Sequence, residues 1–132
     1  LLESGLRTKT ALVIETGEPR EDHHFACLIG YGAGLVHPYL ALATARDVPS
    51  TIKGEHGITS EKAVKNYIKG IEKGLLKIMS KMGIAAIASY RSAKIFEAVG
   101  IDQGVIDHYF TGTPNHIGGA TLQTFAIDIL RF

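Results

Sequence analysis

Cysteine is scarce in this sequence, which contains only Cys27. One thiol cannot close an intrachain disulfide, complete a four-cysteine zinc site or hold an iron–sulfur cluster by itself. We therefore expect a reducing, cytoplasmic compartment. The neighbours of Cys27 in the run FACLI are apolar, which predicts a buried and unreactive thiol rather than a nucleophile.

An excess of either charge is also absent, since 14 Lys and Arg residues stand against 13 Asp and Glu residues. A net charge of +1 gives no long-range attraction to nucleic acid or to an anionic membrane. No apolar run reaches the roughly 18 residues that a membrane helix requires, and no signal segment stands at the front. We therefore expect neither nucleic acid nor a membrane among the partners.

The length of 132 residues and a hydrophobic content of 45% predict one globular domain or part of one. The sequence lacks an initiator methionine, and residues 119–132 end within an apolar helical pattern. We therefore expect a segment of a larger protein, with residues 1–132 forming part of one domain and no complete second domain.

Short apolar runs alternate with segments of helical periodicity along the chain. Strands are predicted at residues 11–14, 35–40 and 84–88, the first of them fully buried. Helices are predicted at residues 1–7, 19–30, 41–47, 60–82, 92–99, 105–110 and 119–132, and loops at 48–57 and 111–116. This order indicates an α/β fold, with short parallel strands alternating with helices as part of an open α/β domain. Three strands are too few for an eight-stranded barrel.

The clearest element is a helix of about six turns, which Thr59 or Ser60 caps and Gly83 ends. Its apolar residues recur at spacings of three and four, and its lysines follow the opposite side, which is typical of a solvated face. Gly70 and Gly74 each cost about 1 kcal/mol relative to alanine within a helix. Their spacing of four predicts that another backbone approaches the helix closely there.

Two motifs suggest a ligand but have simpler explanations. Gly30, Gly32 and Gly34 lack the third glycine position of a dinucleotide fingerprint, and they favour a turn that ends a helix. Adjacent residues such as His23 and His24 point about 100° apart on a helix, so both cannot readily meet one metal ion. We therefore expect no cofactor-binding or metal-binding residues in this chain.

Two polar segments each follow a predicted strand and precede a predicted helix, at residues 15–21 and 89–92. In parallel α/β sheets, this edge is where ligands and catalytic groups gather. Polar residues at the same place also cap the helix that follows. Both interpretations stay open from the residues alone, and neither selects a substrate.

The same segments resemble a known family. The matching blocks cover nearly the whole chain and keep the family's order: ETGEPRE at 15–21, HHF at 23–25, LIGYGA at 28–33, PYLA at 38–41, KGLLKIMSKMGI at 73–84, SYR at 89–91, IFEAVG at 95–100 and YFTGT at 109–113. Together they resemble the large subunit of glutamate synthase, and in particular the second half of its central domain.

This resemblance implies an enzyme that makes L-glutamate from glutamine and 2-oxoglutarate. An N-terminal amidotransferase domain hydrolyses glutamine, ammonia passes through an internal tunnel, and the imine is reduced in a barrel that binds FMN. Electrons arrive from NADPH, NADH or ferredoxin through FMN and an iron–sulfur cluster, and a plant member would reside in a plastid. The central domain joins the two active sites and helps to wall the tunnel.

On the same resemblance, the catalytic residues, the FMN site and the cluster ligands all lie outside these 132 residues. We expect the isolated segment to be inactive, with the amidotransferase and FMN domains of its own chain as partners and an electron-donor subunit or ferredoxin beyond them. The residues expected to contact other domains or to lie beside the tunnel are Glu15, Arg20, Tyr90, Arg91, Thr111 and Thr113.

Four positions depart from the family's usual pattern. The family commonly has glycine at Ser92 and glutamine at Lys94, and it has serine and arginine at Asn115 and His116. These differences leave open a divergent paralogue with altered domain contacts. Two other functions also stay open, namely a stand-alone, non-catalytic α/β interaction scaffold and an independent flavin enzyme.

Overall fold

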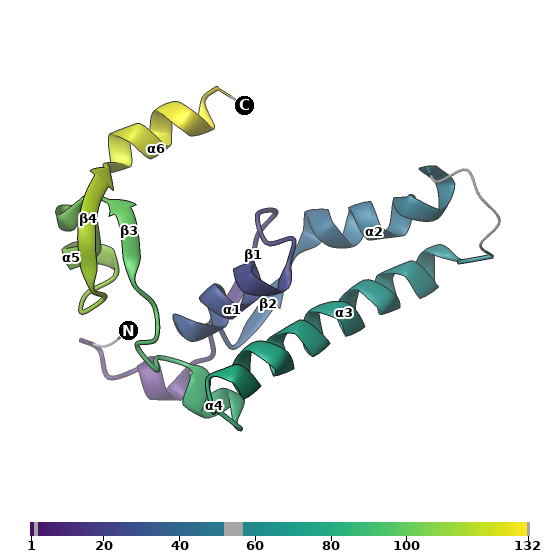
Figure 1. Cartoon of the computed structure of the whole chain (residues 1–132), viewed down its shortest axis with the longest axis horizontal. Helices are drawn as coiled ribbons and strands as arrows, with labels where there is room; N and C mark the ends of the chain where they lie inside the picture. Colours follow the sequence, from purple (N-terminus) through teal and green to yellow (C-terminus); the bar gives the residue numbers. More distant parts are fainter. Residues whose placement is uncertain (2, 52–56, 132) are drawn as a thin grey trace. The chain divides into compact units, whose positions relative to one another are not determined.

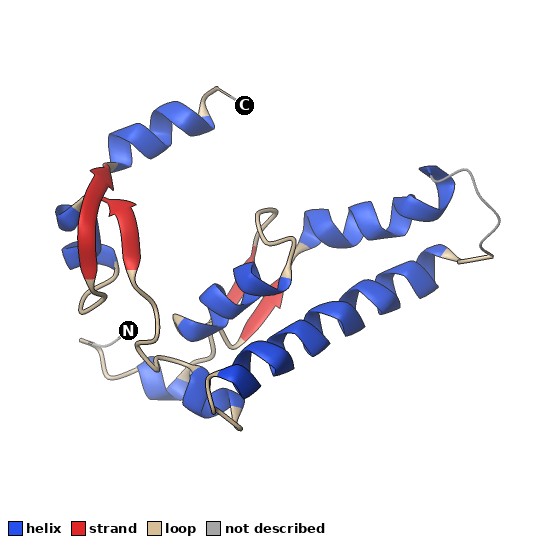
Figure 2. Cartoon of the chain, in the orientation of Figure 1, coloured by secondary structure: helices blue, strands red, loops and turns tan. Residues whose placement is uncertain are grey.

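The computed structural model describes residues 1, 3–51 and 57–131. The chain divides into two compact units, Leu1–Ala93 and Lys94–Phe132. Helices alternate with short parallel strands in each unit (Figures 1 and 2). This arrangement confirms the predicted α/β class and is consistent with an open α/β domain.

The first unit begins with a βαβ crossover, in which β1 (Val13–Glu15) leads through α1 (Asp22–Gly30) to β2 (Leu35–His37). The two strands are parallel, with Val13 beside Leu35 and Glu15 beside His37. The helix ends at the predicted glycines, where the amide of Ala33 donates to the carbonyl of Leu28. The spacing of Gly30, Gly32 and Gly34 therefore marks the end of a helix.

A helical hairpin follows, formed by α2 (Tyr39–Thr51) and α3 (Ser60–Lys81), which lie side by side in Figure 1. Thr59 caps α3 by accepting a hydrogen bond from the amide of Lys62, as predicted, and the chain leaves the helix through Gly83 at φ +70°. Helix α1 also packs on α3. The buried core of this unit consists of Phe25, Ala26, Ala33, Met79 and Tyr90.

The second unit contains another βαβ crossover, with β3 (Ala98–Ile101), α5 (Gln103–Tyr109) and β4 (Asn115–Ala120), followed by α6 (Leu122–Ile129). Strands β3 and β4 are parallel, but their register shifts twice along the ladder. Helix α5, predicted at 105–110, packs against both strands and buries Val105 and Ile106. Ala98 of β3 completes this small core.

The segment between the two units differs most from the predictions. Residues 84–88 do not form a strand, because the chain enters the single-turn helix α4 (Ile87–Tyr90). Residues 92–99 do not form a helix, and their last two residues belong to β3. Ser92 and Lys94 explain this difference, since both adopt left-handed backbone conformations, with φ +58° and +54°, that interrupt a right-handed helix.

Several boundaries also move. The described residues of the predicted 1–7 helix do not form an α-helix, and they lead into a short 3-10 helix, Arg7–Lys9, after Gly5 at φ +67°. Helix α1 begins at Asp22 rather than at Pro19, and β2 stops at His37. The predicted 48–57 loop is helical as far as Thr51, and its residues 52–56 lie outside the described residues. Strand β4 occupies the start of the predicted 119–132 helix, whose residue 132 also lies outside the described residues.

The burial predicted for the first strand is wrong. Val13 is 65% exposed and its neighbour Leu35 is 55% exposed, because a two-stranded sheet leaves one face uncovered. The close approach predicted at two glycines of α3 holds only at Gly74, where a Cβ atom would lie 2.5 Å from the Cβ of Asp22. The neighbour there is a side chain of α1, whereas Gly70 faces open space.

Candidate functional site

The loop of residues 16–21, which connects β1 to α1, carries a cluster of polar contacts in the first unit. The amide of Thr16 extends the sheet by donating to the carbonyl of His37 at 3.1 Å. The amide of Glu18 donates to the hydroxyl of Thr16 at 3.3 Å, and Pro19 is fully buried. These contacts hold the loop at the carboxyl edge of the parallel strands, as its position after a strand predicts.

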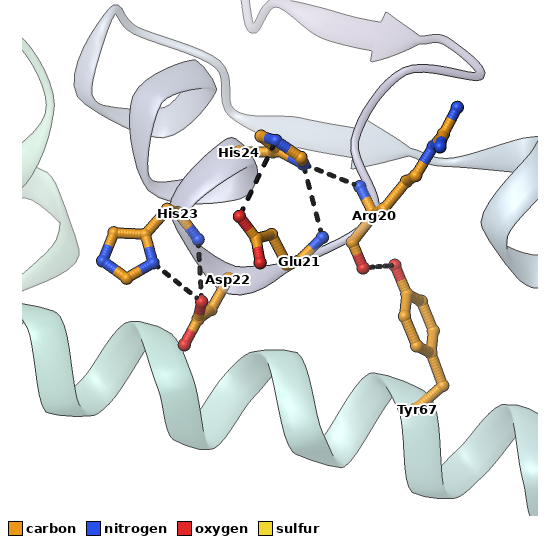
Figure 3. Close-up of polar contacts among 6 residues, drawn as sticks. All are labelled: Arg20, Glu21, Asp22, His23, His24 and Tyr67. Carbon is orange, nitrogen blue, oxygen red and sulfur yellow. Dashed lines mark hydrogen bonds and ion pairs between the residues drawn. The ribbon is translucent and has the colours of Figure 1, made fainter.

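His24 of α1 anchors the end of this loop (Figure 3). Its Nδ1 atom accepts hydrogen bonds from the amides of Arg20, at 3.1 Å, and Glu21, at 3.4 Å. Its Nε2 atom lies 3.9 Å from Oε1 of Glu21. Because Nδ1 accepts these hydrogen bonds, Nε2 is the ring nitrogen that faces the carboxylate as a donor.

Tyr67 of α3 holds the same loop from the other side. Its hydroxyl donates to the carbonyl oxygen of Arg20 at 3.0 Å, a contact between residues 47 positions apart. Burial raises the pKa of Tyr67, which keeps the hydroxyl protonated and able to donate. The backbone of Arg20 is therefore fixed at both its N–H and its C=O group, by side chains from two different helices.

The guanidinium of Arg20 points away from Glu21 and from Tyr67 (Figure 3). Within the described part of the chain, no carboxylate pairs with it. Arg20 lines a hollow of about 500 Å³ between α2 and α3, called here the α2–α3 hollow. Most of this hollow is apolar, and its walls include Leu40, Ala41, Ala45 and Val48 of α2 and Ala63 of α3.

A second hollow, of about 540 Å³, also includes Arg20, with His24 and Cys27 among its walls. Cys27 is exposed, so its predicted burial in the core is wrong. Partial desolvation nevertheless raises the pKa of its thiol, so the group stays protonated near neutral pH. A protonated thiol is a weak nucleophile, so the expected lack of reactivity stays a prediction.

The two adjacent histidines contact different carboxylates. His23 Nδ1 lies 3.0 Å from Asp22 Oδ1, whereas the ring of His24 faces the backbone of the loop (Figure 3). Among the residues described, no three His, Cys, Asp or Glu side chains are grouped so that they could hold a metal ion. The contacts of both histidines therefore stabilise the N-terminal end of α1.

The predicted contact residues fall in both units. Glu15 is the last residue of β1, one position before the 16–21 loop. Tyr90 ends α4 and Arg91 follows it, so the prediction that they lie at the end of a strand is wrong. Tyr90 is 1% exposed, and its hydroxyl has no hydrogen-bond partner among the described residues. Burial, and then the nearby Cys27, raise the pKa of this phenol.

The two threonines of the YFTGT block belong to the turn after α5. The hydroxyl of Thr111 donates to the carbonyl of Asp107 at 2.8 Å. The amide of Thr113 donates to the carbonyl of Phe110 at 2.9 Å. These two hydrogen bonds close the turn locally, and the structure therefore gives both residues a role within the second unit.

Three of the four departures from the family pattern have identifiable surroundings. Ser92 is held in its left-handed conformation while its amide donates to the carbonyl of Gly30 at 2.7 Å. The amide nitrogen of the Asn115 side chain donates to the carbonyl of Ile101 and to Oε1 of Gln103, both at 3.0 Å. The ring of His116 lies 3.7 Å from the carboxylate of Glu97.

These features define an α/β unit whose polar loop lies at the carboxyl edge of a short parallel sheet. The family model for the glutamate synthase central domain matches residues 1–102. The chain therefore belongs to the glutamate synthase central-domain family. In addition, no helix in the described part of the chain has the length and apolar character needed to cross a membrane.

Three curated relatives illustrate the match. The large chain of glutamate synthase [NADPH] from Bacillus subtilis is 52% identical over 131 residues, which are 99% of this chain and 8% of the relative. Glutamate synthase [NADH] from Schizosaccharomyces pombe is 46% identical over 97% of this chain and 6% of its own length. Ferredoxin-dependent glutamate synthase 1 from Arabidopsis thaliana is 44% identical over 100% of this chain and 9% of its own length. The chain thus spans less than a tenth of each.

Sequence reasoning missed the roles of His24 and Tyr67. His24 stands three residues after Glu21, the spacing of a capping box, but with histidine where glutamate or glutamine is usual. That spacing is a local signal that could have revealed the contact. Tyr67 has no such signal, because its partner is 47 residues away.

Proposed function

We propose that residues 1–132 are part of the central domain of a glutamate synthase large chain, which makes L-glutamate from glutamine and 2-oxoglutarate. The observation that carries this proposal is the 52% identity to a glutamate synthase large chain over 99% of the residues. The match to the central-domain family over residues 1–102 supports it independently. Residues 103–132 are assigned to the same domain on the continuous similarity to the relatives.

The role proposed for this segment is to link the amidotransferase and FMN domains and to wall the ammonia tunnel, without catalytic residues of its own. Uncovered apolar pairs in both units support a linking role. Val13 and Leu35 are exposed beside each other in the first sheet, and Val99 and Ile117, at 64% and 59%, in the second. Apolar groups that pair on an open sheet face are typical of surfaces that another protein layer covers.

The cofactors are assigned to other parts of the parent chain. FMN and an iron–sulfur cluster would serve the reduction of the imine, with NADPH, NADH or ferredoxin as the source of electrons. The names of the relatives include each of these three donors. The parent enzyme would work in the cytoplasm, or in a plastid if it comes from a plant, as the chloroplastic relative of Spinacia oleracea does.

Arg91 provides a test of the linking role, because it is exposed directly after the buried Tyr90. In the intact parent enzyme, Arg91→Ala should leave glutamine hydrolysis intact while less of the ammonia reaches glutamate. The measurement is the ratio of glutamine hydrolysed to glutamate formed by reduction, with Lys77→Ala on the exposed lysine face of α3 as the control. An unchanged ratio in both variants would refute a contact role for Arg91.

A further inference from the structure

The α2–α3 hollow combines an apolar lining with one unpaired cation. Among the described residues that line it, Arg20 is the only ionised side chain, and none is acidic. Nothing else in the described chain pairs with the guanidinium. An arginine at the rim of an apolar hollow favours a carboxylate, because its planar fork of donors matches the two carboxylate oxygens.

The hydrogen bonds to its backbone fix the position of Arg20 before any partner binds. His24 holds its N–H group and Tyr67 holds its C=O group, so the origin of the side chain is fixed from α1 and from α3. Burial of the preceding Pro19 adds a third restraint. A group that is already positioned loses less conformational entropy when it forms an ion pair, and so it binds more strongly.

We infer that the α2–α3 hollow seats an acidic segment of the parent chain, whose carboxylate pairs with Arg20 while an adjacent apolar side chain fills the space between the helices. This inference rests on the proposed function, because it takes the occupant from the same polypeptide. Charge complementarity selects an acidic occupant. A volume of about 500 Å³ suits a short side-chain cluster. The chain spans 8% of its Bacillus subtilis relative, so most of the polypeptide that could supply the segment lies outside residues 1–132.

The experiment uses the intact parent chain and a carbodiimide that joins an amine to a neighbouring carboxylate without a spacer. Arg20→Lys keeps the positive charge and supplies the amine. Arg46→Lys is the matched control, because Arg46 is exposed on α2 and is not among the residues that line the hollow. Peptide mass spectrometry should find position 20 joined to an acidic residue outside 1–132, and this link should be missing from the control.

Two outcomes would overturn the inference: no link at position 20, or a link only within residues 1–132. If native lysines of 1–132, such as Lys62, still join other domains, the proposed linking role survives this failure. If no position of 1–132 joins another domain, the linking role fails as well.

A second measurement needs no substitution. In the unmodified parent chain, phenylglyoxal should spare Arg20 while it modifies arginines freely in the urea-unfolded chain. Modification of Arg20 in the native chain at the unfolded rate would contradict an ion pair at this site. This result decides the question even if Arg20→Lys fails to fold.

Discussion

The two units each contain a βαβ crossover, but different groups hold the two crossovers together. In the first, side chains from α1 and α3 meet around the 16–21 loop, and the strands keep a regular register. In the second, the register of β3 and β4 shifts twice, and the backbones touch where a Cβ on Gly119 would lie 2.5 Å from the carbonyl oxygen of Gly100. Both also leave an apolar pair uncovered on one sheet face.

The difference shows that the same topology tolerates two kinds of construction. The first crossover gains a preorganised polar loop, at the cost of depending on a few specific side chains. The second depends on the absence of a side chain at Gly119, and Gly100 adopts φ +76°, a left-handed conformation that favours glycine. Substitutions should therefore affect the two crossovers through opposite mechanisms, namely loss of a contact in the first and added bulk in the second.

The largest effect is expected in the second crossover. Gly119→Ala would place a methyl group against the backbone of Gly100, which cannot move aside as a flexible side chain can. We expect a loss of about 1–3 kcal/mol in the free energy of opening of β3 and β4, measured by native-state hydrogen exchange of the parent chain. Gly118→Ala is the control, because nothing lies within 4 Å of that position. Equal effects of the two substitutions would contradict the close backbone contact.

The next prediction tests how α1 packs against α3. Gly74→Ala would bring a Cβ within 2.5 Å of the Cβ of Asp22, so α1 must shift, and we expect α1 to lose about 1–2 kcal/mol of protection. Gly70→Ala meets open space and should instead stabilise α3 by about 0.5–1 kcal/mol. Hydrogen exchange of the same peptides measures both. If both substitutions stabilise the chain, α1 does not pack at Gly74.

A smaller effect is expected for the clamp on the 16–21 loop. Tyr67→Phe removes the donor to the carbonyl of Arg20 and should weaken protection of the loop amides by about 1 kcal/mol. Tyr109→Phe, at an exposed tyrosine of the other unit, is the control. Because burial raises the pKa of Tyr67, this stabilisation should be complete below the ordinary tyrosine pKa and lost as pH rises through the raised value. If the hydrogen-exchange protection of the wild-type loop does not fall at alkaline pH, the hydrogen bond from Tyr67 does not stabilise the loop.

The smallest effect, and one of opposite sign, concerns the junction after α4. Ser92 has φ +58°, a conformation that glycine adopts without the steric cost of a Cβ atom. Ser92→Gly should therefore raise the unfolding free energy of the first unit by about 0.5–1 kcal/mol, as measured by urea titration of the parent chain. Ser80→Gly, within α3, should lower it by about 0.5 kcal/mol. A destabilising effect at position 92 would show that its hydroxyl matters more than its backbone.

The sequence predicts the first crossover well because its signals are local. The run ALVI favours a strand, the Gly30 region ends a helix, and α3 has a cap and an unbroken apolar periodicity. It places α5 of the second crossover but misses both strands, because β3 and β4 carry glycines and polar residues that have low strand propensity. Their pairing depends on backbone approach across the chain, which no local window contains.

The candidate site follows the same division. The order of elements predicts that the 16–21 loop lies at the end of a strand. It therefore also places Arg20 among the candidate contact residues. The fixed backbone of Arg20 is not predictable, because Tyr67 reaches it from a distant helix. The exposure of Cys27 was also missed, since an apolar run indicates burial in a complete domain, whereas this chain leaves that face of α1 open.

The central claim is that residues 1–132 belong to a glutamate synthase large chain, and the natural protein that contains them tests it most directly. That protein should be purified and its peptides, N-terminal residue and bound flavin determined by mass spectrometry and absorbance. The account predicts a much longer chain, with an amino-terminal cysteine upstream and an FMN domain with a cysteine cluster downstream. A protein that contains residues 1–132 but neither of these domains would contradict it.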